Sequence, residues 1–539
     1  MHMQKDEDKI SLSPYTIAFI TLLQQIKPKP PVDEFSQIEV SSTASFFSVF
    51  YEKIRNAIEY REQNLIRRAA IERILKRRLS LNPSGRGEAE NLVKELLWAG
   101  YFPQNTLSYN DIEKTQRLIN NYLYLYKISR KGIKNSRLFS EFILSLITCE
   151  IEELLSPDEA KKQEYYLYFV FQILKNRIKI KDLDDPQLQD LYIFIAVDKV
   201  YGQGDKNYLR YHLFKLMYGR VQPLNKTQLK RISADLIKET FALIQKSLEN
   251  PYSEKIARFI RKEKASFLIL REITEKDPFQ AEKTLQSKKL LWQQVEQTCQ
   301  QKYALTTKKL NSAAVKSLIY IFITKMLFAL ILEYPLSEFI YGEVDYLSIG
   351  INSIFPPALM FLIIMLTSPP DEKNTKRIFE RIIHIIDKDQ SYENSTAFIT
   401  KKQKQKKPIL IFIFSIFYLL TFFLVLYWIS RILDIFNFNL ISKALFIFFV
   451  SVVSFFAYRV RQIAAEYLLS YKSPFYQPIV DFFFMPILSL GRFFSKEMGR
   501  LNIFIIIFDF LIEAPFKLII EIIEEWIKFI RQKKEEISA

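Results

Sequence analysis

Few residue types in this chain of 539 residues could carry catalysis or hold a metal ion. The two cysteines, Cys149 and Cys299, are too few for a disulfide framework or a thiolate zinc site. The three histidines, His2, His212 and His384, stand far apart in the sequence and form neither an HExxH motif nor a recognisable Ser/His/Asp set. We therefore assign no catalytic, metal-binding or cofactor-binding residues and expect no cofactor.

A run of basic residues is the first pattern that could bind a ligand. Its side chains could contact phosphate groups of lipid or of nucleic acid. Aromatic residues that could stack on bases are not interleaved with it, so we do not expect nucleic acid as the partner. Two interpretations stay open: contact with a membrane surface, or a solvated helix face with Glu62 and Glu72 as partial partners. The run comprises Arg67, Arg68, Arg73, Lys76, Arg77 and Arg78.

Polar residues inside apolar segments are the second pattern. Lys325 lies near the middle of a segment that is long enough to cross a bilayer, where a charge costs roughly 2.5 to 3.5 kcal/mol. It must face protein, water or an anionic partner, unless it snorkels toward a headgroup. The next apolar segment contains Asn352, Pro356 and Pro357. The prolines predict either an interruption that frees backbone carbonyls for a cation or substrate, or a packed kink.

Two further apolar segments, 477–494 and 501–520, also carry charges. Their joining turn is basic, which is the wrong sign for an external loop, so we predict amphipathic helices at the cytoplasmic interface. From position 509 to position 531 the charges recur every three or four residues as one narrow stripe beside a wide apolar face. If both segments spanned instead, four candidate sites would lie inside the membrane: Asp481, Arg492, Asp509 and Glu513.

Charge divides the chain into two unlike parts. Residues 1–315 contain 51 Lys and Arg against 38 Asp and Glu, whereas the remaining residues contain 25 against 21. Long uncharged apolar stretches occur only in the second part. With only 11 glycines, the chain is neither collagen-like nor a glycine-rich disordered protein. This distribution predicts a soluble basic region followed by a membrane region.

The first part reads as helical throughout. Its apolar residues recur at spacings of three and four, as at Leu92, Leu96 and Leu97, which is the spacing of one helical face. Ser156, followed by Pro157, Asp158 and Glu159, predicts a helix start with a capping box. We therefore predict an all-α fold.

Four segments of the second part are long and apolar enough to span a bilayer: 316–334, 347–367, 409–429 and 441–458. The connector 335–346 contains three acidic residues and no Lys or Arg, and the third connector has just Arg431 and Lys443 with Asp434. Lys and Arg are frequent before the first span, in the second connector and after the fourth span. The positive-inside rule therefore predicts that the N-terminal region, the second connector and the C-terminus are cytoplasmic. Heavy use of Ile, Lys and Phe suggests an AT-rich genome and a bacterial cytoplasmic (inner) membrane.

These boundaries predict six parts of the chain. They are an N-terminal arm with a short helix (1–30), a basic cytoplasmic all-α domain (31–310), a transmembrane hairpin (311–370), a cytoplasmic connector (371–407), a second transmembrane hairpin (408–460), and interfacial helices with a charged tail (461–539).

Three functions are compatible with this organisation. A membrane-anchored interaction or scaffold protein, working with a protein partner or as a homo-oligomer, agrees best with the basic helical domain. A transporter or channel component would place Lys325 and the proline-containing helix near its pathway, although four spans without an internal repeat are few for a transporter. A membrane-embedded enzyme is the third, and the spans contain no recognisable nucleophile motif for it.

Overall fold

The computed structural model describes residues 9–27, 29, 38, 49, 52, 63–202, 205–342, 346–365, 370–388, 397–400, 408–469, 477–500, 522, 526, 529, 530 and 533. The helices are α1 (Pro14–Gln24), α3 (Gln63–Leu81), α4 (Glu88–Trp98), α5 (Tyr109–Ser129), η2 (Arg130–Gly132), α6 (Ser136–Leu155), α7 (Pro157–Lys175), α8 (Pro186–Tyr201), α9 (Lys206–Tyr218), α10 (Lys226–Asp235), η3 (Leu236–Thr240), α11 (Phe241–Leu248), α12 (Ser253–Arg261), α13 (Lys264–Lys276), α14 (Pro278–Gln286), α15 (Lys288–Phe328), η4 (Ala329–Glu333), α16 (Tyr334–Tyr341), α17 (Tyr346–Met365), α18 (Glu372–Ile386), α19 (Pro408–Asp434), α20 (Leu440–Ala464) and α21 (Gln477–Arg500). Two short strands, β1 (Ile178–Ile180) and β2 (Ala397–Ile399), pair in parallel. The predicted all-α class is confirmed.

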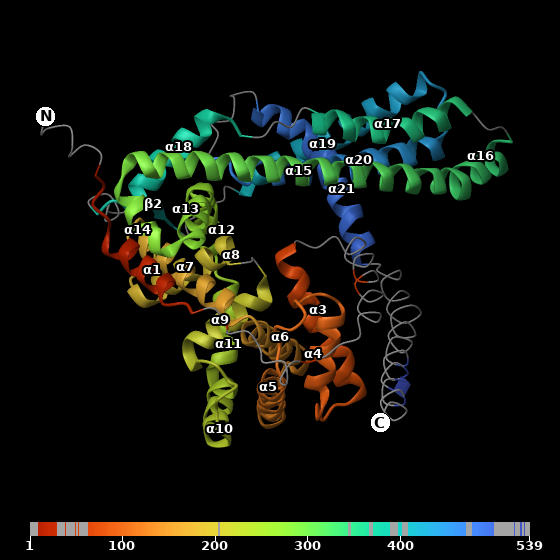
Figure 1. Cartoon of the computed structure of the whole chain (residues 1–539). Coiled ribbons are helices and arrows are strands. Elements are labelled where there is room, and N and C mark those ends of the chain that lie inside the picture. The colour runs from red at the N-terminus through yellow and green to blue at the C-terminus, as the bar shows by residue number, and fades with distance from the viewer. Residues whose placement is uncertain are drawn as a thin grey trace, which may run out of the picture.

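The first lobe of the helical domain contains α3 to α6 with α9, α10 and α11 (Figure 1). Its core is rich in buried aromatic side chains. The Phe142 ring lies edge to face with the rings of Phe214 and Phe241. Because these rings come from α6, α9 and α11, their packing fixes the three helices relative to one another.

The second lobe has a core drawn from three distant parts of the sequence. It combines α1, the helices α7, α8 and α12 to α14, the first half of α15, and α18. Phe19 of α1 stacks on Phe169 of α7 with ring centroids 4.8 Å apart, and Ile378 and Ile382 of α18 are fully buried. The structure thus packs the predicted arm and the start of the predicted connector into the helical domain, because both present an apolar face that this core buries.

Helix α15 joins the helical domain to a second body of helices. It is 41 residues long, and its second half packs with α17 and α20, so that in Figure 1 it extends from the helical domain into the bundle. Three helices of this bundle contain stretches long and apolar enough to cross a membrane: Tyr346–Ile363, Phe412–Asp434 and Leu440–Tyr458. The fourth predicted span, 316–334, is helical and lies in the same bundle, but it carries three charged residues, which sets it apart from the other three.

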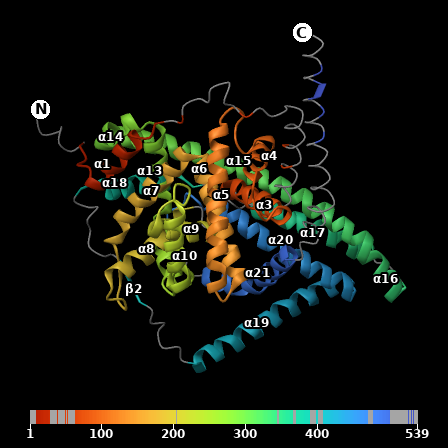
Figure 2. The same cartoon turned by 90° about the horizontal axis from the view of Figure 1, so that it is seen from below.

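The outer helices of the bundle differ in how closely they pack. In α21, Gly491 touches α20 so tightly that an added Cβ would lie 2.0 Å from the Ser451 carbonyl oxygen, so only glycine fits there. In α19, by contrast, only 6% of the apolar stretch is buried, and Figure 2 shows this helix at the margin of the molecule.

Both hairpins leave the helical domain and return to it. After α17, helix α18 rejoins the core of the second lobe. Helix α19 follows β2, which pairs with β1 of the helical domain. After α20, the Tyr467 carbonyl accepts a hydrogen bond of 2.8 Å from Nδ2 of Asn374. The open ends of both hairpins therefore lie beside the helical domain.

One predicted helix cap differs from the structure. Helix α7 begins at Pro157 as predicted, but the Ser156 side chain makes no capping hydrogen bond. Its hydroxyl instead accepts a hydrogen bond of 2.6 Å from Nη1 of Arg67. A tertiary contact has replaced the local one, which a single stretch of sequence does not reveal.

Candidate functional site

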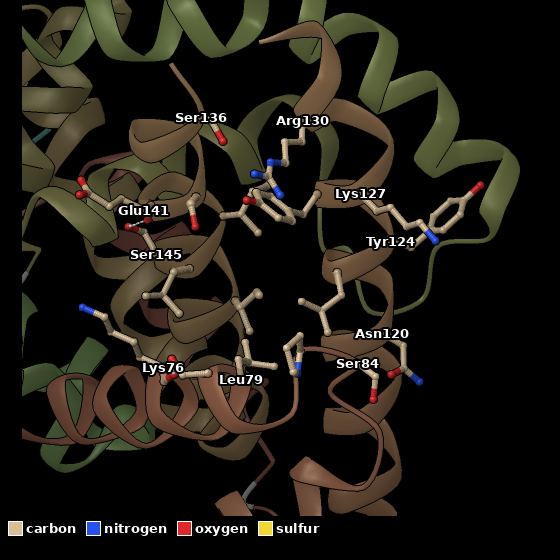
Figure 3. A pocket seen from close by; sticks show the side chains of 18 of the residues that line it. Lys76, Leu79, Ser84, Asn120, Tyr124, Lys127, Arg130, Ser136, Glu141 and Ser145 are labelled. Atoms are coloured by element: carbon tan, nitrogen blue, oxygen red, sulfur yellow. Dashed lines mark hydrogen bonds between the residues drawn. The ribbon is translucent and has the colours of Figure 1, made fainter. Parts of the chain in front are cut away.

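A groove of about 1620 Å³ opens on the first lobe between α3, α5 and α6 (Figure 3). We call it the basic groove. Two carboxylates, Glu72 and Glu141, line it together with eight basic residues. The basic residues are Lys76 of α3, Arg86 of the α3–α4 turn, Lys127 of α5, Arg130 and Lys131 of η2, Arg137 of α6, Arg210 of α9 and Lys226 of α10.

Local backbone geometry brings several of these cations to the rim. Gly85 and Gly87 flank Arg86 with φ angles of +67° and +76°, a conformation that favours glycine and turns the chain sharply between α3 and α4. At the end of α5 the Ser129 hydroxyl is hydrogen-bonded to the Ser233 hydroxyl of α10 at 2.8 Å. The short 3₁₀ turn η2 follows, and Figure 3 shows its Arg130 reaching toward the space between α5 and α6.

Most of the positive charge around the basic groove has no carboxylate partner. Arg137 lies 3.5 Å from Glu141, whereas the other seven basic residues have no carboxylate within ion-pairing distance in the part of the chain that the structure describes. Six of these seven are exposed to solvent. Charges of one sign around a concave surface reinforce each other's potential, so the groove attracts anions.

Arg210 is the seventh and lies at the buried end of this set. Its residue surface is only 5% exposed, and its Nε is buried without a hydrogen-bond partner. Nη1 makes two long hydrogen bonds, of 3.3 Å to Oγ of Ser145 and 3.4 Å to Oδ1 of Asn207. Burial lowers the pKa of Arg210, although a guanidinium keeps its charge near neutral pH. The groove therefore ends in an incompletely satisfied cation.

The structure separates the basic run predicted from the sequence. Five of its six members form ion pairs inside the domain, and Arg68 is only 2% exposed. Successive residues of a helix point about 100° apart, so a run of charges cannot all face one ligand. Lys76 alone of the six lines the basic groove, so the run offers a ligand one lysine rather than a continuous patch. The ion pairs are Arg67–Glu159, Arg68–Glu152, Arg73–Glu52, Arg77–Glu95 and Arg78–Glu95.

His212 belongs to a buried network in the first lobe. Its Nδ1 lies 2.8 Å from Oδ2 of Asp198, and its Nε2 lies 3.9 Å from Oε1 of Glu153. Burial opposes the charged imidazolium, but these two carboxylates outweigh burial and raise the pKa of His212 to about 9. A histidine that is protonated at neutral pH does not serve as a general base there, so we assign this network to stability.

The bundle contains a second candidate site, which we call the Lys325 cluster. Lys325, Glu333 and Asn352 are all completely buried. Nζ of Lys325 lies 2.9 Å from Oε2 of Glu333, and Nδ2 of Asn352 donates a hydrogen bond of 2.7 Å to Oε1 of the same carboxylate. Nδ2 of Asn352 also donates to the Ser442 carbonyl at 3.2 Å. Lys325 thus faces a buried anionic partner and does not snorkel.

A π-helical turn creates the ion pair of this cluster. Glu333 lies eight positions after Lys325, whereas a regular α-helix returns to the same face after seven. The π-helix Ala329–Glu333 holds more residues per turn and restores the alignment. Sequence analysis missed Glu333, although an acid and a base within one predicted span were a signal for it.

The prolines of α17 are embedded in the helix. Helix α17 runs without a break from Tyr346 to Met365 through Pro356 and Pro357. Neighbouring helices hold it together despite the missing donors. Pro356 has no N–H, so the Asn352 carbonyl loses its usual helical donor. Oδ1 of Asn352 and Oγ of Ser442 are also buried without a hydrogen-bond partner, which leaves unsatisfied oxygen atoms beside the ion pair.

The remaining membrane residues that the sequence predicts as sites lie on α21 or outside the described residues. Arg492 lies on α21 and is exposed. Asp481 also lies on α21, but its side chain is outside the described part. Asp509 and Glu513, with the predicted charged stripe, lie outside the described residues.

Comparison of the chain with known protein families, with characterised proteins and with solved structures finds no match. Within the described ranges, no group of three or more His, Cys, Asp and Glu side chains could hold a metal ion. The candidate sites are thus the basic groove and the Lys325 cluster, and function has to be argued from their chemistry.

Proposed function

We propose that this chain is a membrane-anchored docking protein whose helical domain binds an anionic segment of a partner protein in the basic groove. The observation that carries this proposal is the set of seven groove cations without a carboxylate partner among the described residues. Positive charge that is not neutralised within the protein steers and orients an acidic partner. The three apolar helices of the bundle support the anchor.

The proposed topology puts the helical domain and the C-terminus in the cytoplasm of a bacterium, with the bundle in its inner membrane. The Lys and Arg distribution supports this side, and the return of both hairpins to the helical domain supports an even number of passes. Cysteines would replace Glu338 between α15 and α17, and Lys373 on α18. An impermeant maleimide should label Glu338→Cys in intact cells and Lys373→Cys only after permeabilisation. Labelling of both in intact cells would overturn the topology.

Docking can be measured with the full-length protein in lipid nanodiscs and a fluorescein-labelled polyglutamate peptide. We expect binding that weakens as salt is raised, because surface electrostatics are screened. Lys127→Glu, Arg130→Glu and Lys131→Glu combined should reduce affinity at least tenfold. The control combines Lys161→Glu, Lys246→Glu and Lys283→Glu, which are exposed residues outside the groove with the same total charge change. Equal losses for both variants would mean that net charge, not the groove, binds the peptide.

Transport is a second candidate, favoured by the Lys325 cluster. A buried ion pair beside unsatisfied oxygen atoms in a proline-containing helix is the type of arrangement that could bind a small cation. Lys325→Met and Glu333→Gln, made separately, should then alter cation uptake into proteoliposomes. Unchanged uptake in both variants, or no uptake by the unmodified protein, would exclude this role.

A further inference from the structure

The basic groove has an apolar floor beneath its charged rim. Leu79 of α3, Leu123 of α5 and Leu144 of α6 line the groove and are only partly buried against the core of the first lobe. Ile143 and Ile147 of α6 line it as well, and are almost completely buried. The floor therefore offers hydrophobic surface from three helices, which an anion alone would not use.

The cations stand on different sides of this floor. Lys76 belongs to α3, Lys127 to the end of α5, and Arg130 and Lys131 to η2. Figure 3 shows Lys76 and Arg130 at opposite ends of the groove. The volume of about 1620 Å³ exceeds the roughly 300 to 1,000 Å³ of typical small-molecule pockets. The groove therefore has room for a segment of a macromolecule, and its lining matches one with an apolar centre and acidic flanks.

The known modes of peptide recognition narrow the conformation of that segment. Strand addition needs an open sheet edge, but helices and turns line the basic groove, and the strands that the structure describes, β1 and β2, lie in the second lobe. Polyproline recognition needs a groove lined by aromatic rings. The lining of the basic groove contains just two aromatic residues, Tyr124 and Tyr126, and most of its apolar residues are aliphatic. A groove between helices with an apolar floor suits an amphipathic helix.

We infer that the partner segment is an acidic amphipathic helix, with apolar residues at positions i, i+3, i+4 and i+7 on the floor and carboxylates toward the rim. This inference rests on the proposed docking function and specifies its ligand. The helix places its apolar stripe on Leu79, Leu123 and Leu144. Its acidic flanks face Lys76 on one side and Arg130 and Lys131 on the other.

Three labelled peptides of equal length test this inference on the full-length protein in nanodiscs. The first has leucine and glutamate in an amphipathic order, and the second has the same residues in an order without a helical stripe. The third keeps the stripe but has lysine in place of glutamate. We expect the first to bind at least tenfold more tightly than the second, and the third not to bind. Equal binding of the first two would keep the docking function and overturn the helix. Binding of none of them would overturn both.

Two variants distinguish the contribution of the apolar floor to peptide binding from that of the charged rim. Leu79→Gln with Leu144→Gln should weaken the amphipathic peptide about tenfold and leave the permuted peptide unchanged. Arg130→Glu with Lys131→Glu should weaken both peptides. Loss of both peptides in the floor variant, with circular dichroism unchanged, would argue against an apolar contact. A single-stranded oligonucleotide that binds more tightly than the amphipathic peptide would also overturn the inference.

Discussion

The first lobe contains two sets of basic residues, the run on α3 and the cations of the basic groove, and they differ in how their charges are paired. The run on α3 is continuous in sequence, yet five of its six members neutralise carboxylates inside the domain. The basic groove collects its eight cations from seven separate elements of the chain, and seven of these cations have no carboxylate partner within the described ranges. Tertiary packing thus decides which positive charges are available to a partner. A basic run in a sequence is weak evidence that its charges are available.

The Lys325 cluster extends this comparison into the bundle. There a lysine is completely buried and paired with one carboxylate, whereas the buried Arg68 of the helical domain lies 2.7 Å from Glu152 and 3.7 Å from Asp205. Buried pairs contribute little net stability, but removing one partner leaves an uncompensated charge, which is costly. Stability measurements on single residues therefore distinguish the paired charges from those of the groove.

The largest effect should come from the Lys325 cluster. Lys325→Met leaves Glu333 buried without its cation and should lower the free energy of unfolding by roughly 3 to 5 kcal/mol. Adding Glu333→Gln removes the stranded charge while keeping an acceptor for Asn352, so the double variant should recover most of the loss. Unfolding by sodium dodecyl sulfate in mixed micelles, followed by circular dichroism, measures both. A double variant as unstable as the single one would contradict this pairing.

Arg68 should show the same behaviour in the helical domain. Arg68→Met breaks the 2.7 Å contact with Glu152 in a residue that is 2% exposed, and should also cost roughly 3 to 5 kcal/mol. Lys76→Met is the matched control, because it lies on the same helix but is exposed at the groove. It should change stability by no more than about 0.5 kcal/mol. Fluorescence of the buried Trp98 during urea unfolding reports on this lobe. Equal losses of stability in Arg68→Met and Lys76→Met would contradict the difference between the paired and the groove-facing residue of the run.

The His212 network predicts a pH dependence of the first lobe. The pKa of the His212 imidazole is about 9 in the folded chain and close to 6.5 in the unfolded chain. The unfolded chain loses this proton first, so the stabilisation is fully present below about pH 6.5 and decreases as pH rises to about 9, by up to about 3 kcal/mol. His212→Gln should flatten this decrease in urea unfolding measured at several pH values. An equally steep decrease in that variant would assign the pH dependence to other groups.

The general organisation was predictable because it depends on local patterns. Apolar spacing of three and four predicts helices, and long apolar stretches such as 409–429 and 441–458 predict the helices of the bundle. Lys325 and Asn352 were also identifiable, since polar residues in apolar helices need a partner.

The groove and the ion pair were not predictable in the same way. Lys76, Lys131 and Arg210 have no relation in sequence, and only the packing of α3, α5, α6 and α9 brings them to one groove. The pairing of Lys325 with Glu333 depends on a π-helical turn that shifts the helical register. Both features depend on how the helices pack in three dimensions, and the periodicity of apolar residues in the sequence does not reveal this packing.

The smallest stability effect should occur at the groove rim, and it tests the comparison most directly. Lys127, Arg130 and Lys131 are exposed and lie close together in the sequence, so their charges repel each other more than they stabilise the fold. Changing all three to Gln should therefore alter the free energy of unfolding by no more than about 0.5 kcal/mol per residue, and some of the change should be stabilising. The same variant should lose at least tenfold in affinity for the acidic peptide. Urea unfolding and peptide anisotropy on one preparation measure both quantities. A loss of stability comparable to that of Arg68→Met would mean that the rim cations serve the fold, and the two basic sets would then be alike.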